Sequence, residues 1–389
     1  MNIAGIVTEY NPFHNGHKFM IEQVKKKGAD LVVAVMSGAV VQRGDIAIFD
    51  KHFRAKKAVE NGVDLVLELP FPYSCSSAEI FGRTAIYILS SLGKYIINSI
   101  AFGCETYDIN LLKKASEISE NLKDNNLVSE KISQGKSYPT AVYESACELY
   151  GKDVADVLKS PNNTLAIEYI KTAKHIMPWA NFIPVKREYA QHDSDEFNNS
   201  ISSASYIRNS IFDSKNVNEL CPYYFNDESV FNINVMEREV LFRLSCIEKS
   251  QLLNLPDCSE NIADRIIKTM SECPKSLEEF LQKCKSKNIT MARLRRIIMY
   301  AVLGVNKSDF FEPPYVRVLA FNKKGTEILK QCKSSVLPIS TSLKALENSS
   351  DKAKRIISLE NNAVKFQQLC AVGEYNPKNE YNRIIRISE

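Results

Sequence analysis

The sequence reads IAGIVTEYNPFHNGHKFMIEQV over residues 3–24. Its apolar run Ile3–Val7 predicts a buried strand, and Phe19–Val24 has the spacing of an amphipathic helix. The turn between them holds His14–His17, with Gly16 inside it, where the helix N-terminus would lie. A helix N-terminus presents unpaired N–H groups and partial positive charge, and glycine lets a ligand come close to the backbone. The segment therefore predicts a phosphate-binding loop after the first strand of an α/β fold.

His14 and His17 add two imidazoles to this loop. Each imidazole can donate a hydrogen bond to a phosphate oxygen as negative charge builds on it. A pair of histidines in a short loop is also common on ordinary protein surfaces. The place of this pair, in the first strand–turn–helix unit, is what favours nucleotide binding.

The alternation of strand and helix continues through the first half of the chain. Apolar runs at 31–36, 63–69 and 99–102 predict further strands, and 49–61, 76–92 and 110–123 have helical spacing. This order predicts a parallel sheet with helices on both faces, in which ligands bind beyond the carboxyl ends of the strands. The HxGH loop and Gly103 both fall at such ends. We therefore expect a Rossmann-like, nucleotide-binding α/β domain over residues 1–215.

The second half of the chain changes character. Helical spacing dominates at 236–245, 262–270, 277–284 and 292–303, and residues 316–321 with the polar segment 322–325 predict a strand and turn. We expect residues 216–389 to form a mainly helical region with a small terminal α/β element. Residues 1–215 hold 24 Lys and Arg against 25 Asp and Glu, whereas residues 216–389 hold 26 against 21. The second region is thus the more favourable partner for a polyanion.

Composition excludes several classes of protein. An apolar content of 44% and a charged content of 25% are ordinary for a soluble globular chain. No apolar run approaches the roughly 20 residues that span a membrane. The ten cysteines include no CxxC pair, which argues against a zinc site and a disulfide framework. With no basic-then-apolar leader, we expect a cytoplasmic protein with reduced cysteines and no membrane or zinc partner.

Three further segments carry candidate phosphate ligands. Residues 201–208 read ISSASYIR, where Ser202, Ser203 and Arg208 would surround a helix start. Taken alone, however, the two serines favour ordinary helix capping. Arg187 follows a predicted strand at 182–185, where it could meet a phosphate or lie on the surface. Asn162 could contact a ligand, or one of Asn162 and Asn163 could cap the next helix.

A cluster of arginines stands at the start of the helix 292–303. Thr290 can cap this helix, and Arg293, Arg295 and Arg296 follow it at once. Cations near a helix N-terminus oppose the helix dipole, so these arginines add little to the helix there. We expect them to bind the phosphate backbone of an RNA. A solvated or acid-paired helix face is an equally good interpretation.

The segment Thr8–His17 resembles the signature of the HxGH nucleotidyltransferase superfamily. The residues TEYNPFHNGH are similar to the pattern of one branch of this superfamily, the bacterial tRNA(Met) cytidine acetate ligases. In the superfamily an ISSTxIR-like segment is the second signature, and 201–208 match it with Ala204 at a position that usually carries a hydroxyl. The two signatures stand in the expected order, about 185 residues apart. The resemblance covers essentially the whole chain and is strongest over 1–105 and 160–210.

This resemblance implies a two-step reaction. The acetate carboxylate attacks the α-phosphate of ATP to give acetyl-adenylate and pyrophosphate, and the exocyclic amine of a tRNA cytidine then takes the acetyl group and releases AMP. The product is N4-acetylcytidine at the wobble position of elongator tRNA(Met). His14 and His17 would be catalytic, and Mg²⁺ would accompany ATP. By the same resemblance, the residues expected to bind ATP are Val7, Thr8, Glu9, Asn11, Phe13, Asn15, Gly16, Met20, Gly103, Asn162, Arg187, Ser202, Ser203 and Arg208.

Three other functions compete with this one. A small-molecule adenylyltransferase of the coenzyme A or NAD precursor type shares both signatures, but such enzymes are commonly much shorter. A non-catalytic RNA-binding protein would not need the intact histidines. A class I aminoacyl-tRNA synthetase would carry a KMSKS-like segment, and none is present.

Overall fold

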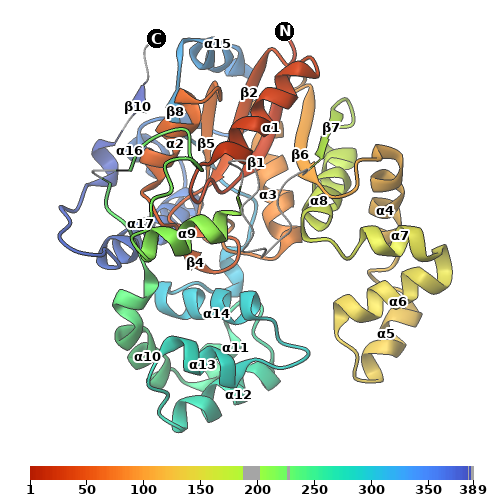
Figure 1. Cartoon of the computed structure of the whole chain (residues 1–389), viewed down its shortest axis with the longest axis vertical. Helices are drawn as coiled ribbons and strands as arrows, with labels where there is room; N and C mark the ends of the chain where they lie inside the picture. The colour runs from red at the N-terminus through yellow and green to blue at the C-terminus, as the bar shows by residue number, and fades with distance from the viewer. Residues whose placement is uncertain (187–201, 226–227, 384, 387–389) are drawn as a thin grey trace.

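The computed structural model of this chain describes residues 1–186, 202–225, 228–383 and 385–386 (Figure 1). Its centre is an eight-stranded sheet in the order β10-β8-β5-β2-β1-β6-β7, with β9 paired to β8. Five adjacent strands are parallel, as expected from the sequence: β5 (Leu65–Leu69), β2 (Leu31–Ser37), β1 (Ile3–Thr8), β6 (Ser99–Cys104) and β7 (Asn181–Lys186). The Rossmann-like fold is confirmed.

Helices cover both faces of this sheet because its strands are apolar on both sides. β2 is buried along its whole length. On one face the sheet packs against α1 (Asn15–Lys26) and α2 (Lys51–Glu60). On the other face it packs against α3 (Ala78–Ser91) and α8 (Pro161–Ile176).

The strand order reverses at β1, since later strands are added to the sheet first on one side of β1 and then on the other. The chain proceeds from β1 to β2 and β5 on one side, and then crosses back to β6 and β7 on the other. In parallel sheets the crevice beyond such a reversal is where ligands bind. The HxGH loop follows β1 directly, and Gly103 lies near the end of β6.

Two insertions extend the sheet domain, and of their elements only the helix at 110–123, which is α4, was predicted. The β3–β4 hairpin (Val40–Val41 and Asp45–Ile46) follows β2. A helical arm precedes α8 and projects to the right in Figure 1. It is made of α4 (Ile109–Asn121), α5 (Asn126–Ser133), α6 (Tyr138–Tyr150) and α7 (Lys152–Val157).

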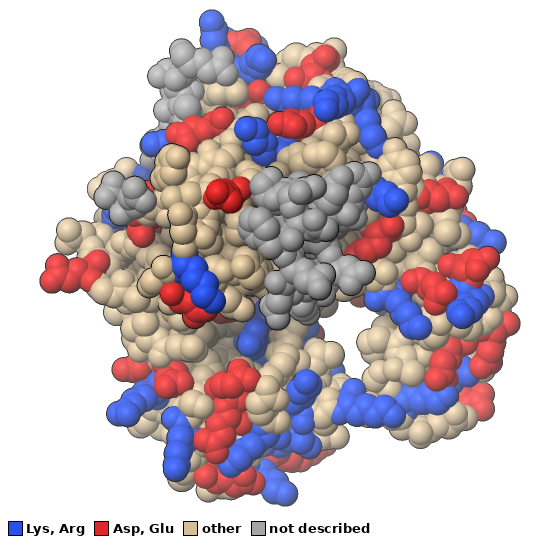
Figure 2. Space-filling model, viewed as in Figure 1, with Lys and Arg blue, Asp and Glu red and all other residues tan. Residues whose placement is uncertain are grey.

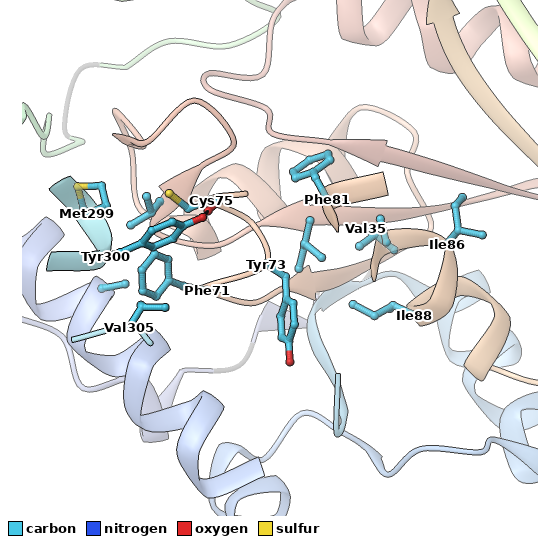
Figure 3. Close-up of a cluster of buried hydrophobic side chains, with 14 of the residues drawn as sticks. Val35, Phe71, Tyr73, Cys75, Phe81, Ile86, Ile88, Met299, Tyr300 and Val305 are labelled. Carbon is cyan, nitrogen blue, oxygen red and sulfur yellow. Dashed lines mark hydrogen bonds between the residues drawn. The ribbon is translucent and has the colours of Figure 1, made fainter. Parts of the chain in front are cut away.

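The last helix before residue 216 is α9 (Ala204–Phe212), and the chain then continues into a helical lobe below the sheet in Figure 1. After η1 (Ile233–Met236), the helical lobe consists of α10 (Glu237–Ser245), α11 (Lys249–Leu253), α12 (Glu260–Ser271), α13 (Leu277–Cys284) and α14 (Met291–Leu303). The helices predicted at 236–245, 262–270, 277–284 and 292–303 therefore form with small shifts of boundary. Two contacts of Tyr300 fix α14 beside the sheet: its ring lies tilted against that of Phe71, and its hydroxyl donates to the carbonyl of Cys75 (Figure 3).

The chain then returns to the sheet. β8 (Val316–Phe321) lies antiparallel to β5, and the remaining elements surround it. The segment 322–325, predicted as a turn, instead begins a helix, because the Asn322 side chain caps α15 by accepting from the N–H of Gly325. The remaining elements are η2 (Lys307–Asp309), α15 (Lys323–Gln331), η3 (Cys332–Ser334), β9 (Ile339–Ser340), α16 (Leu343–Glu347), α17 (Asp351–Leu369), η4 (Glu380–Asn382) and β10 (Ile385–Arg386).

A buried cluster of charges joins these late elements to the first half. The Lys51 ammonium lies 2.6 Å from Glu68 Oε1, 2.8 Å from Glu360 Oε1 and 3.1 Å from Glu380 Oε2. Arg317 adds a second cation, 2.9 Å from Glu380. Burial opposes the charge on Lys51, but the three carboxylates outweigh it and raise the pKa of Lys51. Among the described residues, no helix is long and apolar enough to cross a membrane.

Candidate active site

Two backbone hydrogen bonds orient the histidines of the HxGH loop. His14 is the N-cap of α1, and its Nδ1 accepts from the N–H of Gly16 at 3.1 Å. The Nδ1 of His17 accepts from the N–H of His14 at 3.2 Å, so the two side chains form a capping box. Because a backbone N–H can only donate, each neutral imidazole carries its proton on Nε2. The loop thus holds two Nε2–H donors at a helix N-terminus, with the ring centroids 3.8 Å apart.

Aromatic rings hold the imidazole of His17 in place. Tyr10 packs edge-to-face against it, with centroids 4.9 Å apart, and Phe13 lies 5.6 Å away. Tyr10 is buried and has a φ of +46°, a left-handed conformation that is strained for a residue with a bulky side chain. Such strain persists where the surrounding structure demands it, and it is frequent at functional sites.

The segment after α9 braces the same loop. Asn15 donates from its N–H to Leu220 O at 3.0 Å and from Nδ2 to Glu219 O at 2.8 Å. The Tyr223 hydroxyl donates to Phe13 O at 2.8 Å, and burial raises the pKa of that phenol. Sequence reasoning did not find this brace, because its bonds go to carbonyl groups and leave no pattern in the side chains.

The structure brings the two signatures together. The Arg208 guanidinium donates to Asn11 O at 2.7 Å and to Ser205 Oγ at 3.1 Å, and its burial lowers its pKa. Ser203 caps α9 by accepting from the N–H of Tyr206, so the capping interpretation holds for this serine. Ser202 is buried just before it.

The buried Arg54 fixes the strand ends beside the loop. From α2 it donates to Glu9 O at 2.5 Å, to Ser37 O at 3.1 Å and to Gly38 O at 2.5 Å. Burial lowers the pKa of Arg54 to about 10, which leaves it charged at neutral pH. These bonds tie the carboxyl end of β1 to that of β2, and no sequence motif predicted them.

Several predicted ATP ligands use their side chains or carbonyls within the protein. Asn11 Oδ1 accepts from the N–H of Ile48 at 2.8 Å, and Glu9 Oε1 accepts from the N–H of Gln42 at 2.9 Å. Phe13 is fully buried. Of the predicted ATP ligands at the carboxyl end of β1 and along α1, the partly exposed ones are Val7, Thr8, Glu9, Asn15, Gly16 and Met20.

Beyond β6, Glu105 organises the start of α8. Its Oε1 accepts from Asn162 Nδ2 at 2.7 Å, and its Oε2 accepts from the N–H of Asn163 at 2.9 Å. Asn163 is 1% exposed, and its Oδ1 accepts from the N–H groups of Glu105 and Thr106. Neither asparagine is the N-cap of α8, which is Ser160, so the capping interpretation was wrong. Asn162 is partly exposed near Gly103; Arg187 lies outside the described residues.

The three arginines of α14 differ in their surroundings. Arg296 is 9% exposed and forms an ion pair with Asp257 at 2.9 Å. Arg293 donates to Asp257 O at 2.9 Å. Arg295 is partly exposed. The acid-paired alternative therefore applies to Arg296, whereas Arg295 lies where a ligand can reach it.

A family model described as "HIGH Nucleotidyl Transferase" matches residues 1–382. The chain belongs to this family. It is 38% identical over 357 residues to a tRNA(Met) cytidine acetate ligase of Clostridium perfringens strain SM101, covering 86% of this chain and 88% of that protein. It is 35% identical over 401 residues to the enzyme of the same name from Clostridium kluyveri strain ATCC 8527, covering 95% and 97%.

Solved structures agree with this assignment. Apo Thermotoga maritima TmcAL (form I) has a TM-score of 0.90 and 27% sequence identity, with all of both chains covered. TmcAL bound with alpha-thio ATP has a TM-score of 0.84 at the same identity, covering 94% of this chain and 95% of that one. The resemblance read from Thr8–His17 is thus confirmed, and the chain is a member of the tRNA(Met) cytidine acetate ligase family.

Proposed function

We propose that this protein is an ATP-dependent ligase that joins acetate to a cytidine of tRNA(Met). The observation that carries the proposal is the meeting of the two signatures. Arg208 of the second signature donates to Asn11, three residues before His14 of the first. Relatives that cover 95% of the chain are named for this reaction.

The first step activates acetate. A carboxylate oxygen of acetate forms a bond to the α-phosphorus of ATP, the bond from that phosphorus to the bridging oxygen breaks, and pyrophosphate leaves. The protein contributes position and charge stabilisation to such a transfer. The Nε2–H groups of His14 and His17 and the N-terminus of α1 would stabilise the phosphate oxygens, and Ser202, Ser203 and Arg208 would hold the departing pyrophosphate.

The second step transfers the acetyl group. The exocyclic amine of cytidine attacks the carbonyl carbon, the bond from that carbon to the AMP oxygen breaks, and the amine loses a proton. The product is N4-acetylcytidine, which we place at the wobble position of elongator tRNA(Met). A base in an anticodon loop can be turned out of its stack, and proteins read such splayed bases best.

The same proposal assigns the ATP site. It is formed by the ends of β1 and β6 and the starts of α1, α8 and α9. Nearby carboxylates already accept backbone N–H groups, as Glu9 does from Gln42 and Asp45 from Ile46. Because these carboxylates are already hydrogen-bonded within the protein, they fit an Mg²⁺ ion that arrives with ATP and is bound mostly by phosphate and water. Such an ion would neutralise charge on the triphosphate. The proposed contacts are Val7, Thr8, Glu9, Asn11, Phe13, Asn15, Gly16, Met20, Gly103, Asn162, Arg187, Ser202, Ser203 and Arg208.

Transfer of labelled acetate to total bacterial tRNA, with and without ATP, tests this function. We expect label in N4-acetylcytidine after nucleoside analysis, only when ATP is present, and none with the His14→Ala variant. If no label reaches tRNA while another small substrate drives release of pyrophosphate, the protein is a small-molecule adenylyltransferase instead.

A further inference from the structure

The β3–β4 hairpin connects the HxGH loop with the helical lobe. In the turn between β3 and β4, Gln42 donates from its N–H to Glu9, just after β1. At its tip, Gly44 packs on the backbone of α14 and has a φ of +77°. A Cβ at Gly44 would lie 2.4 Å from the N of Arg296 and 2.9 Å from the Cβ of Arg295. The hairpin tip and α14 are therefore in direct backbone contact, which only glycine allows.

This contact gathers arginines from three distant parts of the sequence. Arg43, exposed at the hairpin tip, precedes Gly44, and Arg295 belongs to the turn of α14 against which Gly44 packs. Arg208 lies next, at the HxGH loop. Burial lowers the pKa of Arg208, and the nearby charges of Arg43 and Arg295 lower it further. Asp45 and Glu9 act in the opposite direction.

The other arginines of α14 are engaged elsewhere. Arg293 and Arg296 both bond to Asp257. The face of the helical lobe seen in Figure 2 carries basic and acidic side chains side by side. That face therefore does not single out an RNA-binding surface, whereas the junction of the hairpin tip with α14 places Arg43 and Arg295 together beside the nucleotide site.

We propose that Arg43 and Arg295 jointly bind a backbone phosphate of the RNA next to the reacting nucleotide, at the junction of the β3–β4 hairpin and α14. The inference rests on the proposed function. The triphosphate already has Arg208, the two serines and the N-terminus of α1. Arg43 and Arg295 both act on Arg208 as neighbouring positive charges, and guanidinium is the side chain best suited to phosphate. Two elements that touch at Gly44 fix the spacing of the two cations.

Binding of total tRNA by the Arg43→Ala, Arg295→Ala and double variants, measured over a range of salt concentrations, tests the inference. We expect each single variant to bind about 3- to 10-fold more weakly. Because the two arginines share one phosphate, the slope of log affinity against log salt should fall by about 1 in the double variant. Arg238→Ala, which removes an exposed charge from α10, is the matched control and should change affinity less than about 2-fold. Affinity of the double variant equal to that of the control overturns the inference.

A second arm tells RNA phosphate from the phosphates of ATP. Exchange of labelled pyrophosphate into ATP, driven by acetate without tRNA, reports on the first step alone. If exchange falls in the double variant as much as tRNA binding does, the arginines serve the triphosphate and the inference is wrong. Wild-type protein that transfers no acetate would instead contradict the proposed function, so the two failures are distinct.

Gly44→Ala provides an independent test of the geometry. The added Cβ would force the hairpin tip away from α14 while leaving both arginines in the chain. We expect weaker tRNA binding with the same loss of salt dependence as in the double variant. Gly28→Ala, at another positive-φ glycine with open space around it, controls for backbone strain. Equal binding by the two glycine variants contradicts the assigned junction.

Discussion

Replacing His17 with asparagine should separate the two roles of this side chain. The Nδ1 atom of His17 accepts a backbone N–H within the loop, and its Nε2–H is the proposed phosphate donor. Asparagine places an oxygen where Nδ1 lies and nothing where Nε2 lies. His17→Asn should therefore keep the cap of α1 and lose the donor, whereas His17→Ala loses both.

The magnitudes follow from these two bonds. Removing one preorganised donor from a charged transition state lowers a rate by about 10²–10³, or about 2.7–4 kcal/mol. Losing a side-chain cap costs about 1 kcal/mol of stability, near 1 °C in melting temperature for a chain of this length. We expect acetate-dependent pyrophosphate exchange to fall by that factor in both variants, and the melting temperature to fall only in His17→Ala.

Two results would refute this reasoning. Exchange by His17→Asn within about 3-fold of wild type would show that Nε2 does not act on the phosphates. A loss of stability in His17→Asn equal to that in His17→Ala would show that the bond to Nδ1 does not support the loop.

Other predictions concern buried groups around the site. Lys51→Met leaves three buried carboxylates with one cation and should destabilise the fold by about 3–5 kcal/mol, measured by chemical denaturation. Tyr10→Phe should keep full exchange activity, because it retains the edge-to-face contact with His17; Tyr10→Leu removes that contact and should lower the rate several-fold at unchanged KM for ATP. Burial lowers the pKa of His52 below its unfolded value of about 6.5, although Glu380 raises it in part. Below about pH 6.5 the unfolded chain therefore binds more protons than the folded one, and the free energy of unfolding falls as the pH drops. Thermal melts of wild type and His52→Gln between pH 5 and 8 should show a steeper acid loss in wild type.

The sequence predicted the part of the fold that rests on local pattern. Ile3–Val7, the HxGH turn and Phe19–Val24 became β1, its loop and α1, because strand and helix periodicity are properties of neighbours in the chain. The strand at 316–321 was also found. Its pairing with β5 could not be predicted from the sequence, because antiparallel register between strands about 250 residues apart depends on tertiary packing.

At the candidate site, too, the sequence predicted the residues that stand in local motifs and missed those that act through tertiary contacts. His14, His17 and Arg208 stood in motifs, and the structure brings them to one loop. Arg54, Tyr223 and the brace at Glu219–Leu220 were missed, because each acts through a carbonyl group that any residue could supply. Arg296 was predicted to bind RNA, but its partner Asp257 lies 39 residues away and is visible only in the fold.

Tracing the oxygen of acetate tests the central claim most directly. If acetate attacks the α-phosphate, one of its oxygens stays with AMP when the amine of cytidine takes the acetyl group. With [¹⁸O₂]acetate, ATP and tRNA, mass spectrometry should find one ¹⁸O atom in each AMP formed, in step with N4-acetylcytidine. Unlabelled AMP, or ADP as the product, would contradict the acetyl-adenylate route and the role given to the HxGH loop.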